Sequence, residues 1–182
     1  MHRILRSLLV FILLAVAGFA ADTPTVAETK KNAEAGDAWA QYYLGMMYAE
    51  GEGVSKDGAE AVKWFRLAAE QGDAWAQYYL GMMYAEGEGV SKDGAEAVKW
   101  FRLAAEQGYA NAQFNLGNSY YNGVGVPKDL VQAHVWINIS AAKGNELAQK
   151  KMPILEEQMT SEQKAEAMKL ARELFAKLPK GK

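Results

Sequence analysis

The sequence contains no cysteine and only two histidines in 182 residues. Without a thiol there is no cysteine nucleophile and no disulfide, so packing alone must hold the fold together. Only His134 lies beyond the N-terminal segment discussed next, and one histidine cannot build a zinc site of the usual kinds. We therefore expect no catalytic residue, no metal and no cofactor, and interpret His134 as a packing or surface residue.

Long hydrophobic runs are also scarce, and the one present lies at the N-terminus. Arg3 and Arg6 precede an apolar stretch that ends in small residues, as in a secretory signal peptide. The uncharged run over 7–21 is shorter than the roughly 20 apolar residues of a membrane-spanning helix, which favours a signal peptide over a transmembrane anchor. We expect cleavage near Ala20, a mature chain without a membrane span, and a periplasmic or secreted location; without a cysteine near the cleavage site, a lipoprotein is excluded.

Positive charge is not in excess. The formal net charge is −2, and losing Arg3 and Arg6 with the leader makes it −4. A chain of this sign is not expected to bind nucleic acid. Half of the residues are hydrophobic and 23% are charged, which is typical of a folded globular protein.

What the sequence does contain is a repeat. Residues 37–72 read DAWAQYYLGMMYAEGEGVSKDGAEAVKWFRLAAEQG, 73–108 repeat them unchanged, and 109–144 keep the spacing with substitutions. A period of this length is typical of stacked-repeat architectures. Apolar residues at helical spacing predict a helix over about 38–50, and a second helix begins after Asp57.

The positions shared by all three units follow the pattern A-x-x-x-L-G-x-x-Y-x-x-G-x-G-V-x-x-D-x-x-x-A-x-x-W-x-x-x-A-A-x-x-G, with Ser140 as the one departure. This pattern resembles the Sel1-like repeat, a relative of the tetratricopeptide repeat. The resemblance implies an all-α, right-handed α-α superhelical solenoid whose first helices line a concave surface that binds a protein or peptide. Some secreted Sel1-like proteins carry a disulfide in each repeat, and this chain departs from that pattern.

The repeat divides the chain into segments. They are a signal peptide over 1–20, an N-terminal capping helix over 21–36, Sel1-like repeats over 37–72, 73–108 and 109–144, and a degenerate half-repeat with a C-terminal capping helix and tail over 145–182.

Within a unit, three features of the helices can be predicted. Gly45 in mid-helix costs about 1 kcal/mol relative to alanine, and close approach of a neighbouring helix would compensate. Asp57 and Glu60 have the spacing of a capping box. The face of the second helix that we expect to be buried consists of Ala61, Trp64, Phe65, Ala68 and Ala69.

The two ends of the array depart from the pattern. Thr23 and Pro24 predict the start of the first helix, which should run to about residue 35. Pro153 takes the place of the mid-helix glycine and predicts a kink or break in a helix that ends near residue 158. Thr160 and Gln163 should cap a last helix that ends near Lys177.

One stripe of residues is the candidate binding surface. On the first helices it lies within an arc of roughly 60°, facing away from the apolar positions Ala40 and Leu44. In the third unit every stripe position is asparagine, which argues against a core location, whereas the first two units present aromatic residues and methionine, which are enriched at interfaces. The alternative is that Trp39 and Trp75 pack sideways onto neighbouring first helices. The stripe comprises Trp39, Tyr43, Met46, Glu50, Trp75, Tyr79, Met82, Glu86, Asn111, Asn115, Asn118 and Asn122.

An enzymatic alternative comes from the resemblance, because some Sel1-like proteins have been assigned as penicillin-binding or β-lactamase proteins. Two S-x-x-K strings, Ser140 to Lys143 and Ser161 to Lys164, are present. The S-D-N and K-T-G elements of serine β-lactamases are not. The sequence therefore favours a non-catalytic scaffold that binds another protein or a peptide over a cell-wall-related enzyme.

Overall fold

The computed structural model describes residues 25–179, and in this range the chain forms α-helices joined by loops. The leader predicted over 1–20 lies outside the described residues. The helices are α1 (Val26–Glu34), α2 (Ala38–Glu50), α3 (Gly58–Glu70), α4 (Ala74–Glu86), α5 (Gly94–Glu106), α6 (Ala110–Asn122), α7 (Leu130–Ala142), α8 (Glu146–Glu156) and α9 (Ser161–Lys177).

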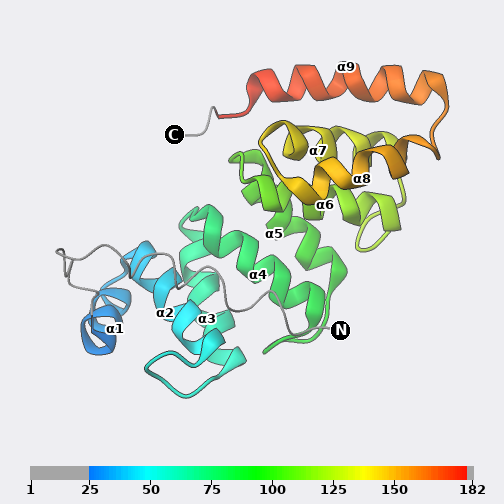
Figure 1. Cartoon of the computed structure of the whole chain (residues 1–182). Helices are drawn as coiled ribbons and strands as arrows, with labels where there is room; N and C mark the ends of the chain where they lie inside the picture. Colours follow the sequence, from blue (N-terminus) through cyan, green and yellow to red (C-terminus); the bar gives the residue numbers. More distant parts are fainter. Residues whose placement is uncertain (1–24, 180–182) are drawn as a thin grey trace.

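The six central helices form three helix pairs, one for each repeat. α2 packs on α3, α4 on α5 and α6 on α7, and each second helix also packs on the first helix of the next unit. Figure 1 shows the pairs following one another from α1 at one end of the molecule towards α9 at the other. The chain is an α solenoid, which confirms the predicted fold class.

The interior of each pair depends on a glycine in the first helix. The predicted buried face of α3 is confirmed, because Ala61, Trp64, Phe65, Ala68 and Ala69 are all buried. A Cβ added to Gly45 would lie 2.7 Å from Phe65 Cδ1, and one added to Gly81 would lie equally close to Phe101. The close approach predicted from the mid-helix glycine is therefore confirmed.

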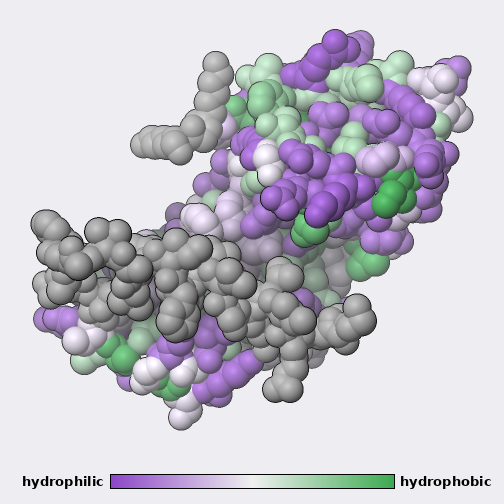
Figure 2. Space-filling view, in the orientation of Figure 1, coloured by the Kyte–Doolittle hydropathy of each residue, from purple (hydrophilic) through white to green (hydrophobic). Residues whose placement is uncertain are grey.

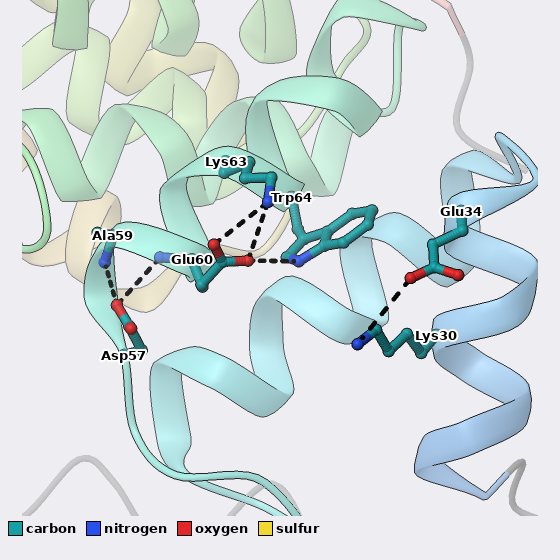
Figure 3. Close-up of polar contacts among 7 residues, drawn as sticks. All are labelled: Lys30, Glu34, Asp57, Ala59, Glu60, Lys63 and Trp64. Carbon is teal, nitrogen blue, oxygen red and sulfur yellow. Dashed lines mark hydrogen bonds and ion pairs between the residues drawn. The ribbon is translucent and has the colours of Figure 1, made fainter.

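The N-terminus of α3 differs from the prediction in one respect. Asp57 caps the helix by accepting a hydrogen bond from the backbone N–H of Glu60 at 3.1 Å. The carboxylate of Glu60 does not complete a capping box, because the N–H of Asp57 already donates to the carbonyl of Tyr48. Glu60 instead accepts from Lys63 Nζ and Trp64 Nε1, each at 3.2 Å (Figure 3).

The first helix also starts differently. Its N-cap is Thr25, whose side chain accepts from the N–H of Glu28 while the Glu28 carboxylate accepts from the N–H of Thr25. This capping box starts α1 at Val26, and its hydrogen bonds lower the pKa of Glu28. Thr23 and Pro24 lie outside the described residues.

At the C-terminal end of the solenoid, the predicted end of the helix near residue 158 agrees with the structure, whereas the predicted break at Pro153 does not. Pro153 neither breaks nor ends α8, which continues to Glu156. The helix pairing also differs from that of the repeats: Gly45 and its counterparts are buried, whereas Pro153 is exposed, because α9 packs on α7 instead of covering α8. The Thr160 capping box and the end of α9 at Lys177 agree with the prediction.

Figure 2 shows hydrophilic side chains over much of the C-terminal part of this face, with hydrophobic residues scattered between them. A largely polar outer surface at an end of the array is what a capping segment requires, because no further unit covers it.

Consecutive units also meet backbone to backbone through glycine. A Cβ on Gly89 would lie 2.1 Å from the carbonyl oxygen of Gly58, and one on Gly125 would lie 2.0 Å from that of Gly94. The loop of one unit thus rests on the N-terminus of the previous unit's second helix. Leu130 occupies the corresponding position in the third unit, where no such loop follows.

A ladder of side-chain amides runs between the units. In α4, Gln77 Nε2 donates to the carbonyl of Ala69, and its Oε1 accepts from Gln107 Nε2 at 2.8 Å. In the third unit Lys143 replaces Gln107, and its ammonium donates to the Gly108 carbonyl at 2.7 Å. The buried Oε1 of Gln113 therefore has no hydrogen-bond partner.

Candidate binding groove

The first helices form a groove of about 830 Å³ at the boundary of the three units. α2, α4 and the start of α6 supply its walls. The described residues that line it are Tyr42, Met46, Ala49, Trp75, Tyr78, Tyr79, Met82, Met83, Glu86, Glu88, Gly108, Tyr109, Ala110 and Asn111. Rings and methionine side chains make up most of this lining.

The structure brings only half of the predicted stripe together in the groove. None of the twelve stripe residues is buried, which agrees with the argument that positions accepting asparagine are not core. Six residues of the stripe line the groove: Met46, Trp75, Tyr79, Met82, Glu86 and Asn111. The other six, Trp39, Tyr43, Glu50, Asn115, Asn118 and Asn122, lie outside its lining.

The two tryptophans show that packing and exposure are not exclusive alternatives. Trp75 is 51% exposed, yet its ring centroid lies 4.8 Å from that of Tyr109 and 6.4 Å from that of Tyr42. Trp39 is 56% exposed and stacks on Tyr43 of its own helix at 5.3 Å. Trp75 is therefore held by residues of neighbouring units while about half of its surface remains exposed.

The asparagines of the third unit make local hydrogen bonds. Asn111 Oδ1 accepts from Asn145 Nδ2 at 2.9 Å, and Asn122 Nδ2 donates to the carbonyl of Asn118. Asn115 Nδ2 lies 3.1 Å from the sulfur of Met82. The asparagine end of the stripe is thus largely occupied by contacts within the protein.

Three tyrosines of the groove were missed from the sequence. Tyr42 and Tyr78 directly precede the stripe residues Tyr43 and Tyr79, and the helical rotation of about 100° per residue places them outside the 60° arc. They instead face the neighbouring first helix: the Tyr78 ring centroid lies 5.0 Å from that of Tyr109, in an edge-to-face arrangement.

Tyr109 occupies the helix-cap position of its unit. In the first two units Asp37 and Asp73 cap α2 and α4 by accepting from the backbone at 2.7 Å. Tyr109 makes no such bond, so α6 has no side-chain cap. A missing cap costs about 1 kcal/mol, and in exchange the ring packs against Trp75 and Tyr78 in the groove. This departure from the repeat is the signal that could have located the groove.

The electrostatics of the groove come from carboxylates. Burial, more than any other cause, raises the pKa of Tyr42, Tyr78, Tyr79 and Tyr109. These phenols accordingly stay protonated and neutral at ordinary pH. The charge of Glu86, which also lines the groove, further raises the pKa of Tyr78.

The residues considered for catalysis have structural roles. His134 is fully buried, and its Nε2 lies 3.1 Å from Glu156 Oε1, which agrees with its interpretation as a packing residue. Ser140 Oγ and Lys143 Nζ each donate at 2.7 Å to backbone carbonyls around the start of α6. Ser161 is the exposed first residue of α9.

Two absences hold for the described part of the chain. Between residues 25 and 179, no three histidine or acidic side chains are grouped so that they could hold a metal ion. No helix in this range is both long enough and apolar enough to cross a membrane.

The fold and the repeat pattern together define the family. The Sel1 repeat family model matches residues 40–73, 76–109 and 110–145. The chain belongs to the Sel1 repeat family, as the resemblance in the sequence indicates.

Two solved structures are similar to the chain. A Sel1 repeat protein from Oxalobacter formigenes is 43% identical with a TM-score of 0.65, over 70% of this chain and 96% of that one. The second is c5321, a protective antigen of uropathogenic Escherichia coli strains with an SLR fold. It is 32% identical with a TM-score of 0.66, over 84% of this chain and 41% of that one. No curated protein matches the sequence.

Proposed function

We propose that the protein is an exported, non-catalytic scaffold that binds a segment of another protein in the groove between α2, α4 and α6. The observation that carries the proposal is the open, ring-lined groove of about 830 Å³ at the junction of the units. Aromatic residues and methionine are enriched at protein interfaces, and buried aromatic anchors supply much of the binding energy there. The exposed half of Trp75 is such an anchor.

An enzymatic function is less well supported. Ser140 and Lys143 are committed to backbone carbonyls, and Ser140 is fully buried. A serine nucleophile must instead be accessible and within reach of a base. Fluorescent-penicillin labelling of the protein should accordingly give no covalent adduct.

The binding function can be tested with peptides selected on the full chain from a random display library. Trp75→Ala should weaken the selected peptides at least tenfold, because truncating a central aromatic anchor costs about 2 kcal/mol or more. Trp39→Ala is the matched control: it removes the same residue at the same unit position with similar exposure, but outside the groove. Fluorescence anisotropy gives both affinities, and equal losses in the two variants would contradict the groove as the binding site.

Stability must be measured on the same variants. Trp100 is only 5% exposed, so Trp100→Ala should cost several kcal/mol through a cavity. Trp75→Ala should cost much less, because about half of the residue's surface is already in solvent. If Trp75→Ala unfolds the protein as readily as Trp100→Ala does, Trp75 is a packing residue and the proposal fails.

A further inference from the structure

The groove offers several ring surfaces within a short distance of one another. The centroid of Tyr109 lies 4.8 Å from that of Trp75 and 5.0 Å from that of Tyr78, and the ring pairs are inclined at 54° and 66°. Tyr79 lies 5.3 Å from Tyr78 and is inclined at 75° to it. Rings at these distances contact one another, so a ligand can reach only the ring surfaces that they leave open to the groove, among them the exposed half of Trp75. Ring faces carry negative potential and attract cations.

Charge in the groove is of one sign. The lining residues within the described range include Glu86 and Glu88 but no lysine, arginine or histidine. Glu86 ends α4, and Glu50 ends α2 at the same unit position. The Glu86 carboxylate acts on the Tyr78 hydroxyl and the Glu50 carboxylate on the Tyr79 hydroxyl, raising the pKa of each. The negative potential of the rings is therefore reinforced by carboxylates rather than neutralised.

Elsewhere in the described chain, aromatic rings are covered by the protein's own cations. Lys63 lies 5.4 Å from the Trp64 ring centroid, and Lys99 lies 5.3 Å from that of Trp100. Lys151 lies 3.9 Å from the centroid of Tyr121. Arg66 and Arg102 lie over Tyr84 and Tyr120 in the same way. Every cation–ring contact found among residues 25–179 thus involves a ring outside the groove.

We infer that the groove selects peptide segments carrying an arginine or lysine side chain, which lies against the surfaces of Trp75, Tyr78 and Tyr109 that line the groove, with its charge towards Glu86. This inference rests on the proposed binding function and adds the chemistry of the ligand. An apolar flank of the same peptide contacts Met46 and Met82. The volume of about 830 Å³ accommodates more than one side chain, so a basic residue and an apolar neighbour both fit.

The test uses the peptides selected on the full-length protein. Peptides that lose binding with Trp75→Ala should contain a basic residue. Its replacement by glutamine, which keeps the polar length but removes the charge, should weaken binding about tenfold, the size of a well-desolvated cation–ring contact with a carboxylate nearby. Glu86→Gln should weaken the same peptides severalfold, and added salt should reduce the difference between the peptide pairs.

The matched control is Glu70→Gln, which removes one negative charge from the exposed end of α3 and should leave the affinity unchanged. If peptides that require Trp75 bind equally well when glutamine replaces their basic residue, the inferred selection of a cation is wrong. The proposed binding function of the groove would still hold. Equal effects of Glu86→Gln and Glu70→Gln would also overturn the selection of a cation. If no selected peptide requires Trp75, the binding function itself fails.

Discussion

The amide ladder is incomplete in the third unit, and repairing it should stabilise the protein. Lys143 reaches the Gly108 carbonyl but leaves the buried Oε1 of Gln113 without a partner. In the second unit Gln107 Nε2 serves both acceptors, at 2.9 Å from the Gly72 carbonyl and 2.8 Å from Gln77 Oε1. Lys143→Gln places the same amide at the corresponding position of the third unit.

The magnitude follows from the cost of the unpaired acceptor. A buried acceptor without a partner costs about 1 to 3 kcal/mol. The substitution also removes the hydrogen bond from the Lys143 ammonium to the Gly108 carbonyl, and this loss offsets part of the gain. The loss is limited because burial lowers the pKa of Lys143 and so already disfavours its charged form. We expect a net increase of about 1 kcal/mol in the free energy of unfolding, which corresponds to about 2 to 4 °C in the melting temperature of a chain of this length.

Urea denaturation and thermal melting of Lys143→Gln and of the reciprocal variant Gln107→Lys test this reasoning. Gln107→Lys creates the same defect in the second unit, because its ammonium can reach the Gly72 carbonyl but leaves Gln77 Oε1 unpaired. It should therefore lower stability by a similar amount. A Lys143→Gln protein no more stable than the parent, together with an unchanged Gln107→Lys protein, would refute the ladder as a source of stability.

Three further predictions concern the repeat and the leader. Gly81→Ala should lower the melting temperature, because the added Cβ would lie 2.7 Å from Phe101. This steric cost should exceed the gain of about 1 kcal/mol in helix propensity, and an unchanged melting temperature would contradict the close approach of the helices. Deleting residues 73–108 should leave a folded but less stable chain with a cooperative melt, because α3 would then present to α6 the same residues that α5 presents now. A chain that fails to fold would show that the units are not interchangeable. The intact mass of the native protein should correspond to a chain beginning at or near Ala21, and a full-length mass in the membrane fraction would contradict cleavage.

Much of the fold could be predicted because three copies of the repeat show which positions are retained. The bounds of α2 and the role of Gly45 follow from residues that recur at a fixed spacing. One local error arose where a side chain had a competing partner. Glu60 contacts Lys63 and Trp64 because the Asp57 N–H is already bonded.

The error at Pro153 was of another kind. The proline predicts a break in its own helix, but α8 continues past it, and the departure from the repeat lies in α9, which packs on α7. Which helices pair depends on the space that their side chains leave between them. The hydrophobic pattern of a single helix does not specify which neighbouring helix will pack in that space.

The candidate site was predicted in part for a similar reason. Helical periodicity correctly placed Trp75 and Tyr79 on a surface that is not buried. It could not show that Tyr42 and Tyr78 face the next unit, because that depends on the angle between consecutive units. Tyr109 was passed over because its position is otherwise a helix cap, and its value lies in contacts with residues of the preceding unit.

The glycine contacts between units bear on how the gene can change. Because Gly58 and Gly94 present the same backbone surface to the loop that follows, recombination within the duplicated segment can add or remove a whole 36-residue copy without altering any junction. Leu130 at the end of the array offers no such surface to a further loop. The number of copies is therefore free to vary upstream of residue 109. The groove containing Tyr109 is inherited once, at the final junction, provided that at least two copies precede it to supply the walls that α2 and α4 form here.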